Sequence, residues 1–283
     1  MSDIQSDRVS PKSKLKSLLF RHGLDVSYVS QKRRAKLIGL PRIRPDHVFM
    51  CSYPRSGNTW TRMIVACLLN PDLDSINLDG IDTLVPDIAE PQYHNDKARV
   101  YKDHRPAFDL FPRVIYNYRD GRDCLVSEHK YAVNALGYTR SRKEFVTHGR
   151  GHTFGMWHEH IDKALAFQTK YPDRILMLRY ESMRDDPRLS VTRIAEFLGI
   201  RLETIDFDRI LDLTNLNTQR GASEQHIDPR KRHTIGSGKV GGWKQALDAS
   251  EIELFEAMSA KTLMALDYPL LNRWAGETCL GKD

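Results

Sequence analysis

Hydrophobic and polar residues alternate along the chain in a pattern that predicts strands followed by helices. Short apolar runs at residues 47–53, 99–102, 113–118 and 174–180 are typical of buried strands. Segments with apolar residues at helical spacing, or with helix-starting and helix-ending signals, predict helices over residues 59–69, 120–133, 154–170, 187–197 and 249–265. Because strands alternate with helices, we expect an α/β fold with a central parallel sheet that is flanked by helices.

Three stretches are predicted to lack regular structure. Residues 70–97 form a loop-rich segment, residues 136–151 a mobile polar insertion, and residues 215–242 a long irregular segment rich in Arg, Lys, His, Ser and Gly. Loops of this length in a compact domain are usually functional or disordered. No linker or repeat divides the chain, so we expect one domain over residues 47–283, preceded by a basic arm with a short capping helix at residues 1–46.

Composition narrows the possible partners and compartment. The 283 residues are 40% hydrophobic and 28% charged, with a formal charge of +6. This excess favours anionic partners such as nucleic acid, anionic lipid or phosphorylated small molecules, although a solvated basic surface would also explain it. Cys51, Cys67 and Cys124 lie in apolar runs, are expected to be buried thiols, and form no C-x-x-C pair that would suggest zinc. With no signal peptide or bilayer-length apolar run, the protein is expected to be soluble and cytoplasmic, without stable membrane insertion.

The first predicted strand leads into a turn that is suited to binding an anion. Residues 53–60 read YPRSGNTW. Gly57 allows a tight turn whose backbone N–H groups point inward, and the following helix directs its positive end to the same place. The Arg55 guanidinium can grip a phosphate or sulfate with two hydrogen bonds. Further side-chain donors are Ser56, Asn58 and Thr59. The loop lacks the G-x-x-x-x-G-K-[ST] spacing of a Walker A motif, and an ordinary turn that binds nothing is the alternative.

A second anion-binding element is predicted after the strand at 113–118. Arg119 stands at the end of this strand and Ser127 on the helix that follows, and strand ends are where open α/β sheets place ligands. The two side chains could therefore hold one anion from two sides. The alternative is a surface cluster of ion pairs, formed by Arg119, Asp120, Arg122 and Asp123.

These two elements resemble those of the sulfotransferases that use 3′-phosphoadenosine 5′-phosphosulfate (PAPS). The loop at 53–60 is similar to their 5′-phosphosulfate-binding loop, YPKSGTTW, with Arg55 in place of a lysine. Arg119 and Ser127 resemble the arginine and serine that hold the 3′-phosphate of PAPS in that family, although Gly121 replaces a proline. The resemblance covers about residues 48–266 and implies a P-loop-like phosphosulfate site.

The same resemblance implies a general base. Residues 101–106, YKDHRP, are similar to the family segment K-T-H-x-P, which places the base at His104 and a sulfuryl-binding ammonium at Lys102. A neutral histidine has a pKa near 6.5 and can accept a proton at neutral pH. Arg55 cannot release a proton as the family's lysine could, so its expected role is electrostatic. Six other histidines are interpreted as surface or structural residues: His94, His129, His148, His158, His160 and His233.

A third motif at residues 236–244 matches only in part. The family pattern R-K-G-x-x-G-D-W-K, whose Arg-Lys pair touches the 3′-phosphate, has Gly236 and Ser237 in place of that pair. Ser237, Gly238 and Lys239 are expected to contact the nucleotide. The missing charge could come from Arg230, Lys231, Arg232 or Lys239, and a flexible basic loop is the alternative. Trp60 and Tyr180 fit the family's adenine contacts, but both could be core aromatic residues.

The resemblance implies in-line transfer of a sulfuryl group from PAPS to a hydroxyl or amine of a small-molecule acceptor, releasing adenosine 3′,5′-bisphosphate (PAP) without a metal. A carbohydrate or glycolipid acceptor is an alternative. A P-loop-like kinase is less consistent, because no Walker A lysine or metal-binding Asp is found. An RNA-binding or membrane-surface module would need more than the basic segment at 13–40, and no nucleic-acid partner is expected. The protein is expected to be a monomer or homodimer.

Overall fold

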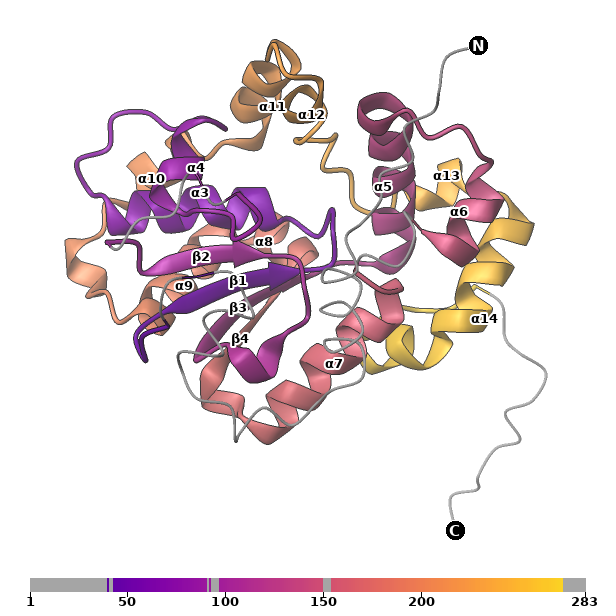
Figure 1. Ribbon diagram of the computed structural model, residues 1–283, viewed down its shortest axis with the longest axis horizontal. Coiled ribbons are helices and arrows are strands. Elements are labelled where there is room, and N and C mark those ends of the chain that lie inside the picture. Colours follow the sequence, from indigo (N-terminus) through magenta and orange to yellow (C-terminus); the bar gives the residue numbers. More distant parts are fainter. Residues whose placement is uncertain (1–39, 41–42, 91, 93–96, 150–153, 272–283) are drawn as a thin grey trace.

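Four parallel strands form the sheet at the centre of the molecule, in the order β2-β1-β3-β4 (Figure 1). The computed structural model describes residues 40, 43–90, 92, 97–149 and 154–271. The strands are β1 (Val48–Ser52), β2 (Val100–Asp103), β3 (Arg113–Tyr118) and β4 (Ile175–Arg179). The predicted parallel α/β architecture is therefore confirmed, and all four strands lie within one residue of the predicted runs. The arm at 1–39 and Cys279 lie outside the described residues.

Helices connect the strands and cover both faces of the sheet (Figure 1). The longer helices are α3 (Asn58–Leu69), α5 (Gly121–Leu136), α7 (Trp157–Lys170), α9 (Pro187–Leu198), α11 (Leu216–Glu224) and α14 (Ala249–Ala265). The shorter ones are α4 (Gly80–Leu84), α6 (Arg142–His148), α8 (Tyr180–Asp185), α10 (Phe207–Leu213), α12 (Pro229–Arg232) and α13 (Trp243–Ala246). Single 3₁₀ turns are η2 (Phe108–Leu110), η3 (Pro172–Arg174) and η4 (Leu202–Thr204). No helix in the described ranges is long and apolar enough to cross a membrane.

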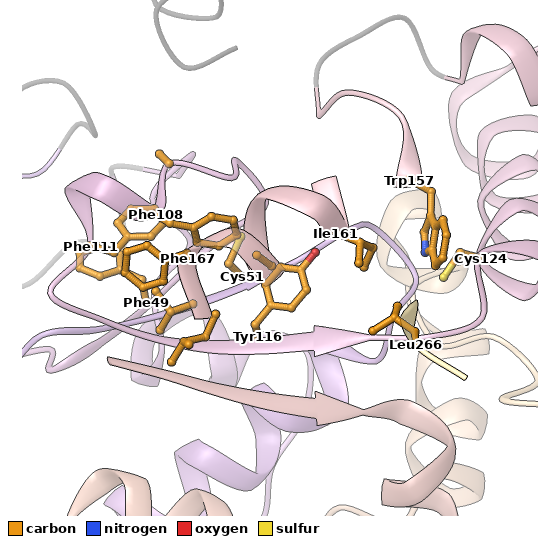
Figure 2. Packing of buried hydrophobic residues seen from close by; sticks show 14 of the residues in the cluster. Phe49, Cys51, Phe108, Phe111, Tyr116, Cys124, Trp157, Ile161, Phe167 and Leu266 are labelled. Atoms are coloured by element: carbon orange, nitrogen blue, oxygen red, sulfur yellow. The ribbon is translucent and has the colours of Figure 1, made fainter. Parts of the chain in front are cut away.

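The sheet separates two hydrophobic cores, because successive side chains of a strand point to opposite faces. Phe49 and Cys51 of β1 pack in one core with α7 and α14, where the Phe49 and Phe111 rings stack with centroids 4.3 Å apart (Figure 2). Val48 and Met50 point into the other core, with α3 and α9. Because both faces of the sheet are covered, β1 and most of β4 read as continuous apolar runs.

Besides the short helix α4 within residues 70–97, the other two segments that were predicted to be irregular also contain helices. Residues 142–148 form α6, which packs on α14 and buries Phe145 and Val146, so the prediction of a mobile insertion was wrong there. Ser141 and Glu144 form a capping box that starts this helix. The stretch at 215–242 contains α11 and α12, capped by Asn215 and Asp228. In both cases short polar capping signals, rather than long apolar patterns, mark the helices.

The three predicted buried thiols are confirmed. Cys51, Cys67 and Cys124 are free and buried, and burial raises the pKa of Cys67 to about 11 and that of Cys124 to about 12. Such thiols are protonated at neutral pH and unreactive, so they serve packing.

Candidate active site

The carboxyl ends of the four strands meet at one edge of the sheet and deliver the predicted site residues there. The parallel register pairs Cys51 of β1 with Asp103 of β2, and Ser52 with Asn117 of β3, so the segments that follow these strands start side by side. They line a cleft of about 960 Å³. Every residue predicted to bind the nucleotide or act on it lines this cleft, except Ser56.

The first loop is shaped by Gly57, which has φ 95° in the left-handed region that favours glycine. A Cβ atom there would lie 2.6 Å from Cδ2 of Tyr180, so the loop rests directly on this ring. Helix α3 begins at the next residue and points its N-terminus at the cleft. Ser56 is fully buried, with its hydroxyl 3.4 Å from Sγ of Cys124, and therefore does not face the cleft as predicted.

Several buried polar atoms beside this loop lack hydrogen-bond partners. Among the described residues, both amide atoms of Asn58, Nε1 of Trp60 and Nε of Arg119 have none. All three side chains are at least nine-tenths buried and line the cleft. Because an unpaired buried polar group is costly, this arrangement fits a polar ligand that would satisfy these atoms.

Arg55 has an unusual backbone and a side chain that leaves the loop. Its φ is 69°, which few non-glycine residues adopt. The Nε atom donates a hydrogen bond to Oγ of Ser127 at 3.0 Å, and Nη1 donates to the carbonyl oxygen of Thr234 at 2.8 Å. Arg55 therefore contacts the second predicted anion element, on α5, and the segment that follows α12.

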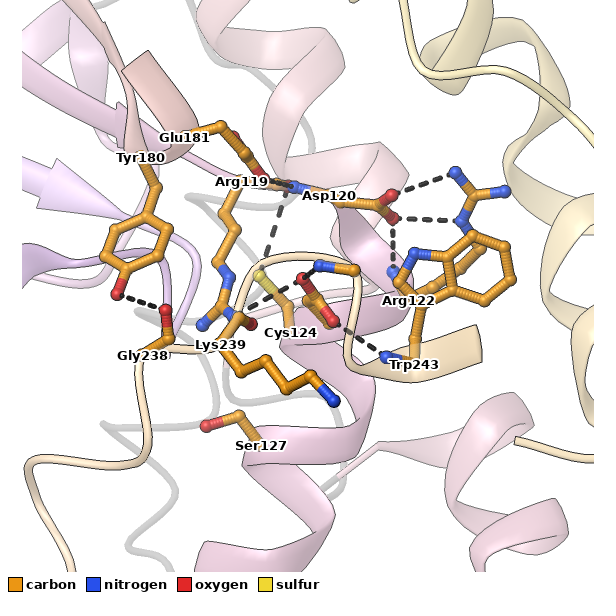
Figure 3. Close-up of polar contacts among 12 residues, drawn as sticks. Arg119, Asp120, Arg122, Cys124, Ser127, Tyr180, Glu181, Gly238, Lys239 and Trp243 are labelled. Atoms are coloured by element: carbon orange, nitrogen blue, oxygen red, sulfur yellow. Dashed lines mark hydrogen bonds and ion pairs between the residues drawn. The ribbon is translucent and has the colours of Figure 1, made fainter. Parts of the chain in front are cut away.

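Arg119, at the end of β3, is the centre of the second element (Figure 3). Its Nη2 donates to the carbonyl oxygen of Lys239 at 2.7 Å and lies 3.4 Å from Oδ2 of Asp123. Its guanidinium stacks on the ring of Tyr180, 4.5 Å from the centroid. The neighbouring Asp120 and Arg122 are also at least nine-tenths buried. The alternative of a surface ion-pair cluster is therefore wrong, since this network is internal.

His104 follows β2 and has a defined hydrogen bond. Its Nδ1 lies 2.9 Å from the carbonyl oxygen of Ser52. Because a carbonyl oxygen can only accept, Nδ1 carries the proton and Nε2 keeps its lone pair. Burial and the Lys102 ammonium lower the pKa of His104 to about 3, so the ring is neutral at pH 7. The edge of the Phe154 ring faces it, with centroids 5.5 Å apart.

Lys102 is paired with Asp87, a residue that sequence reasoning missed. The Lys102 ammonium donates to Oδ2 of Asp87, and Asp87 is also bridged to Lys102 through the backbone in the parallel sense. Although burial opposes it, the nearby cation lowers the pKa of Asp87 to about 2. Asp87 stands in a loop with no local motif, so only the tertiary fold indicates its position.

The segment from α11 to α13 contacts residues around the predicted anion elements. Tyr180 donates from its hydroxyl to the carbonyl oxygen of Gly238 at 3.2 Å. Asp123 accepts hydrogen bonds from the backbone N–H of Gly241 at 2.8 Å and of Trp243 at 3.0 Å (Figure 3). Of the four cations considered for the missing Arg-Lys pair, Lys231 instead pairs with Asp79 and Asp82 of the α4 region.

The amino-acid sequence matches a known protein family. A sequence model described as the sulfotransferase domain matches residues 45–267. The chain belongs to the sulfotransferase family. Human sulfotransferase 4A1 is 23% identical over 276 residues, covering 90% of this chain and 94% of that protein. Dog sulfotransferase 1B1 is 26% identical over 290 residues, covering 90% of this chain and 96% of that protein.

Solved sulfotransferase-fold structures superpose on the chain at low identity and therefore show the fold alone. Mouse sulfotransferase SULT7A1, in complex with PAP, gives a TM-score of 0.60 with 21% identity, covering 80% of this chain and 87% of that one. Retinol dehydratase, in complex with androsterone and inactive cofactor PAP, gives a TM-score of 0.59 with 22% identity, covering 82% of this chain and 84% of that one. Within the described ranges, no group of three or more His, Cys, Asp or Glu side chains could hold a metal ion.

A second histidine of this sulfotransferase, His160, contacts the backbone of His104. His160, on α7, is fully buried, and its Nε2 donates to the carbonyl oxygen of His104 at 2.9 Å. Its Nδ1 accepts from the hydroxyl of Tyr116, at 2.5 Å. The sequence interpretation treated His160 as structural, because its position under His104 depends on how α7 packs on the sheet.

Proposed function

We propose that this sulfotransferase moves the sulfuryl group of PAPS to a hydroxyl or amine of a small-molecule acceptor, with His104 as the general base. One observation carries the proposal. The phosphate loop after β1, His104 after β2, and Arg119 with Ser127 after β3 line a single cleft of about 960 Å³. These are the groups that a nucleotide with phosphates at both ends and a reacting acceptor would each require.

The nucleotide would lie across the strand ends, with its phosphosulfate at the first loop. Inward N–H groups and the N-terminus of α3 suit an anion there. The unpaired amide of Asn58 offers a further donor. The aromatic pair of Trp60 and Tyr180, with ring centroids 6.2 Å apart, lines the cleft where a base could pack. Two solved structures of the same fold contain PAP, which supports a nucleotide of this class as the ligand.

The chemistry would proceed in line. The acceptor oxygen or nitrogen forms a bond to sulfur while the bond between sulfur and the 5′-phosphate oxygen breaks, and the electron pair leaves with PAP. Nε2 of His104 takes the acceptor proton, because Nδ1 is committed to Ser52. The pKa of about 3 keeps this nitrogen unprotonated before the donor binds. Binding an anionic donor nearby would raise the pKa, as an opposite charge does, and make His104 a stronger base.

Lys102 is the cation next to His104 and would balance charge on the sulfuryl oxygens. Its pairing with Asp87 fixes the ammonium in the cleft before the donor arrives. A fixed charge needs no reorganisation when negative charge develops, which is why it stabilises the transition state.

A small hydrophobic or amphipathic acceptor is the expected class. The retinol dehydratase structures contain androsterone or retinol together with PAP, and the present chain shares that fold. Phe154 stands beside His104, where an aromatic or alicyclic acceptor could pack.

The test combines binding and transfer. Calorimetry with PAP should show saturable binding, and an acceptor screen with sulfur-labelled PAPS should identify a product. We expect His104→Ala to lower kcat by about a hundredfold to ten-thousandfold, the contribution of a positioned general base, while PAP affinity is retained. His148→Ala, at an exposed histidine on α6, is the matched control and should leave turnover unchanged. No PAP binding by the wild type would refute the function, whereas full turnover by His104→Ala would refute only the base.

A further inference from the structure

The direction of the Arg55 side chain separates it from the reacting end of the cleft. Arg55 donates to Ser127 on α5 and to the carbonyl oxygen of Thr234, and its guanidinium lies 5.1 Å from the centroid of the Tyr131 ring. The charged groups that act most on its pKa are Glu128, Tyr131 and Arg119. His104, by contrast, is influenced most by Lys102, Asp87 and His160. Different charged groups therefore act on Arg55 and on His104, and the hydrogen bonds of Arg55 place its guanidinium beside Ser127.

Gly236 provides the space that Arg55 fills. A Cβ atom at residue 236 would lie 3.2 Å from Nη2 of Arg55 and 3.7 Å from Oγ of Ser127. The first distance is tighter than ordinary van der Waals contact, so a Cβ atom there would require the guanidinium to shift by a few tenths of an ångström, and a larger side chain would compete with it for the same space. Arg55 comes from the loop after β1 and Gly236 from the segment after α12, so the two positions depend on one another across 181 residues.

The charge around Ser127 is suited to a phosphate. The guanidinium of Arg119 is nearby: its Nη1 lies 3.4 Å from the backbone carbonyl oxygen of Arg55, and its charge helps to lower the pKa of the Arg55 side chain. Asp123 already pairs with Arg119, and Glu128 lies close enough to raise the pKa of Arg55, which burial lowers. A dianion bound here would therefore face the buried guanidinium of Arg119 and the half-buried one of Arg55, whose charges are only partly balanced, and guanidinium groups suit phosphate oxygens.

We infer that Arg55, together with Ser127 and Arg119, binds the 3′-phosphate of the nucleotide rather than its sulfuryl group, and that Gly236 is required for this role. The inference rests on the proposed function and gives Arg55 a different position in it from the one the sequence predicts. The side-chain cation at the sulfuryl end is then Lys102. Gly236 and Ser237 lack the positive charge of the family's Arg-Lys pair, and Arg55, on the phosphate loop, supplies that charge instead.

Two nucleotides that differ only at the 3′-position test this assignment. PAP and 5′-AMP share the adenosine and the 5′-phosphate, and only PAP carries the 3′-phosphate. We expect Arg55→Met to weaken PAP binding by about tenfold to a hundredfold, the usual worth of a charged hydrogen bond, and to change 5′-AMP binding less than about twofold. Arg55→Lys, which keeps the charge, should lose less. Ser127→Ala should show the same selective loss.

The outcomes separate this inference from the function on which it depends. An equal loss of PAP and 5′-AMP binding in Arg55→Met, or a loss of kcat with both affinities retained, would place Arg55 at the sulfuryl end and overturn the inference. Failure of the wild type to bind PAP would instead refute the proposed function. Circular dichroism is used to check that each variant is folded. If Arg55→Met does not fold, the conservative variant Arg55→Lys still tests the inference.

Substitution of Gly236 provides a second, independent test of the inference. We expect Gly236→Val to weaken PAP binding about as much as Arg55→Met does and to leave 5′-AMP binding nearly unchanged. In the Arg55→Met background, Gly236→Val should weaken PAP binding little further, because the guanidinium that it would displace is already absent. Gly221→Ala on α11 is the matched control, since a Cβ atom there meets no atom within 4 Å. Additive losses from Gly236→Val and Arg55→Met would show that the two residues act separately, and would overturn the pairing.

Discussion

Nε2 of His160 lies 2.9 Å from the backbone carbonyl oxygen of His104 and donates a hydrogen bond to it. The Tyr116 hydroxyl, 2.5 Å from Nδ1, fixes the tautomer that makes this possible. The proposed base is thus held at two points, through its own Nδ1 by Ser52 and through its carbonyl oxygen by His160. A residue that acts through another in this way is a positioning residue.

Removing the imidazole of His160 should therefore impair the chemical step more than nucleotide binding. We expect His160→Phe to lower kcat by about tenfold while the KM for PAPS changes less than about twofold, because a small displacement of a base is costly. His160→Gln can still donate to the His104 carbonyl oxygen and should recover part of the loss. Steady-state kinetics of both variants decide the matter. Equal kcat for wild type and His160→Phe would show that His160 only fills space.

The two histidines should also make folding sensitive to mild acid. Burial lowers the pKa of His104 to about 3 and that of His160 to about 4, whereas an unfolded histidine has a pKa near 6.5. Between about pH 4 and pH 6.5 the unfolded chain binds protons that the folded chain does not. The free energy of unfolding therefore falls as pH drops through this window, by up to about 1.4 kcal/mol per pH unit for each histidine.

Urea unfolding at pH 7.5 and pH 5.0 measures this effect. The wild type should be less stable at pH 5.0, and His160→Gln should show a smaller difference between the two pH values because one titrating group is gone. Asp87 does not interfere, since its lowered pKa of about 2 affects stability only below the window. An identical pH difference in wild type and His160→Gln would contradict the prediction for His160.

Local patterns were sufficient to predict the sheet and most of the residues that line the cleft. β1, β3 and β4 contain apolar runs, β2 is a short strand that ends with Lys102 and Asp103, and most side chains of the site stand at or just after the ends of these strands. Parallel pairing then brings the strand ends together regardless of what lies between them. The phosphate loop, His104 and Arg119 could be located for this reason.

The remaining features depend on contacts between distant segments. Asp87 reaches Lys102 because its loop runs beside β2, and His160 reaches His104 because α7 packs under the sheet. The direction of the Arg55 side chain likewise depends on the absence of a side chain at residue 236. No pattern within a few residues of any of these positions encodes such contacts. The helix α6 differs from these cases, because a short capping box at Ser141 and Glu144 marks its start while its seven residues are too few for a clear helical pattern.

Arg122 should be essential for stability, because it neutralises two buried acids. Nη2 lies 2.8 Å from Oδ2 of Asp120 and Nη1 lies 2.7 Å from Oε1 of Glu256, with the Arg122 side chain only 1% exposed. Its guanidinium also stacks 3.9 Å from the centroid of the Trp243 ring. We expect Arg122→Met to lower the free energy of unfolding by about 3–5 kcal/mol, since it leaves buried carboxylates without their cation. Urea titration followed by circular dichroism provides the measurement.

An exposed pair in the same protein provides the control for Arg122. Arg188 and Asp208 lie 3.1 Å apart, with side chains 57% and 90% exposed. Arg188→Met removes the same charge but should cost less than about 1 kcal/mol, because water screens exposed pairs. Similar losses from the two variants would show that burial does not determine the effect. Recovery of stability in the triple variant Arg122→Met, Asp120→Asn, Glu256→Gln would support the electrostatic explanation.

Lys231 ties the segment over the cleft to the α4 region. Its ammonium lies 2.8 Å from Oδ2 of Asp82 and also pairs with Asp79, while Nη2 of Arg62 lies 2.9 Å from Oδ1 of Asp82. Asp82 is buried, so α12 is held to α4 by a pair that is only partly open to water. The segment between α11 and α13 also carries Gly236 and Gly238, which line the nucleotide end of the cleft.

We therefore expect Lys231→Met to loosen this segment. The loss of a partly buried pair worth about 1 kcal/mol should raise the rate of amide hydrogen exchange in residues 225–240 about fivefold and weaken PAP binding by a similar factor. Lys261→Met removes an exposed charge on α14 and controls for the change in net charge. Unchanged exchange in Lys231→Met would mean that the contacts of Tyr180, Arg119 and Asp123 hold the segment without it. Weaker PAP binding by both variants would point to a general effect of charge.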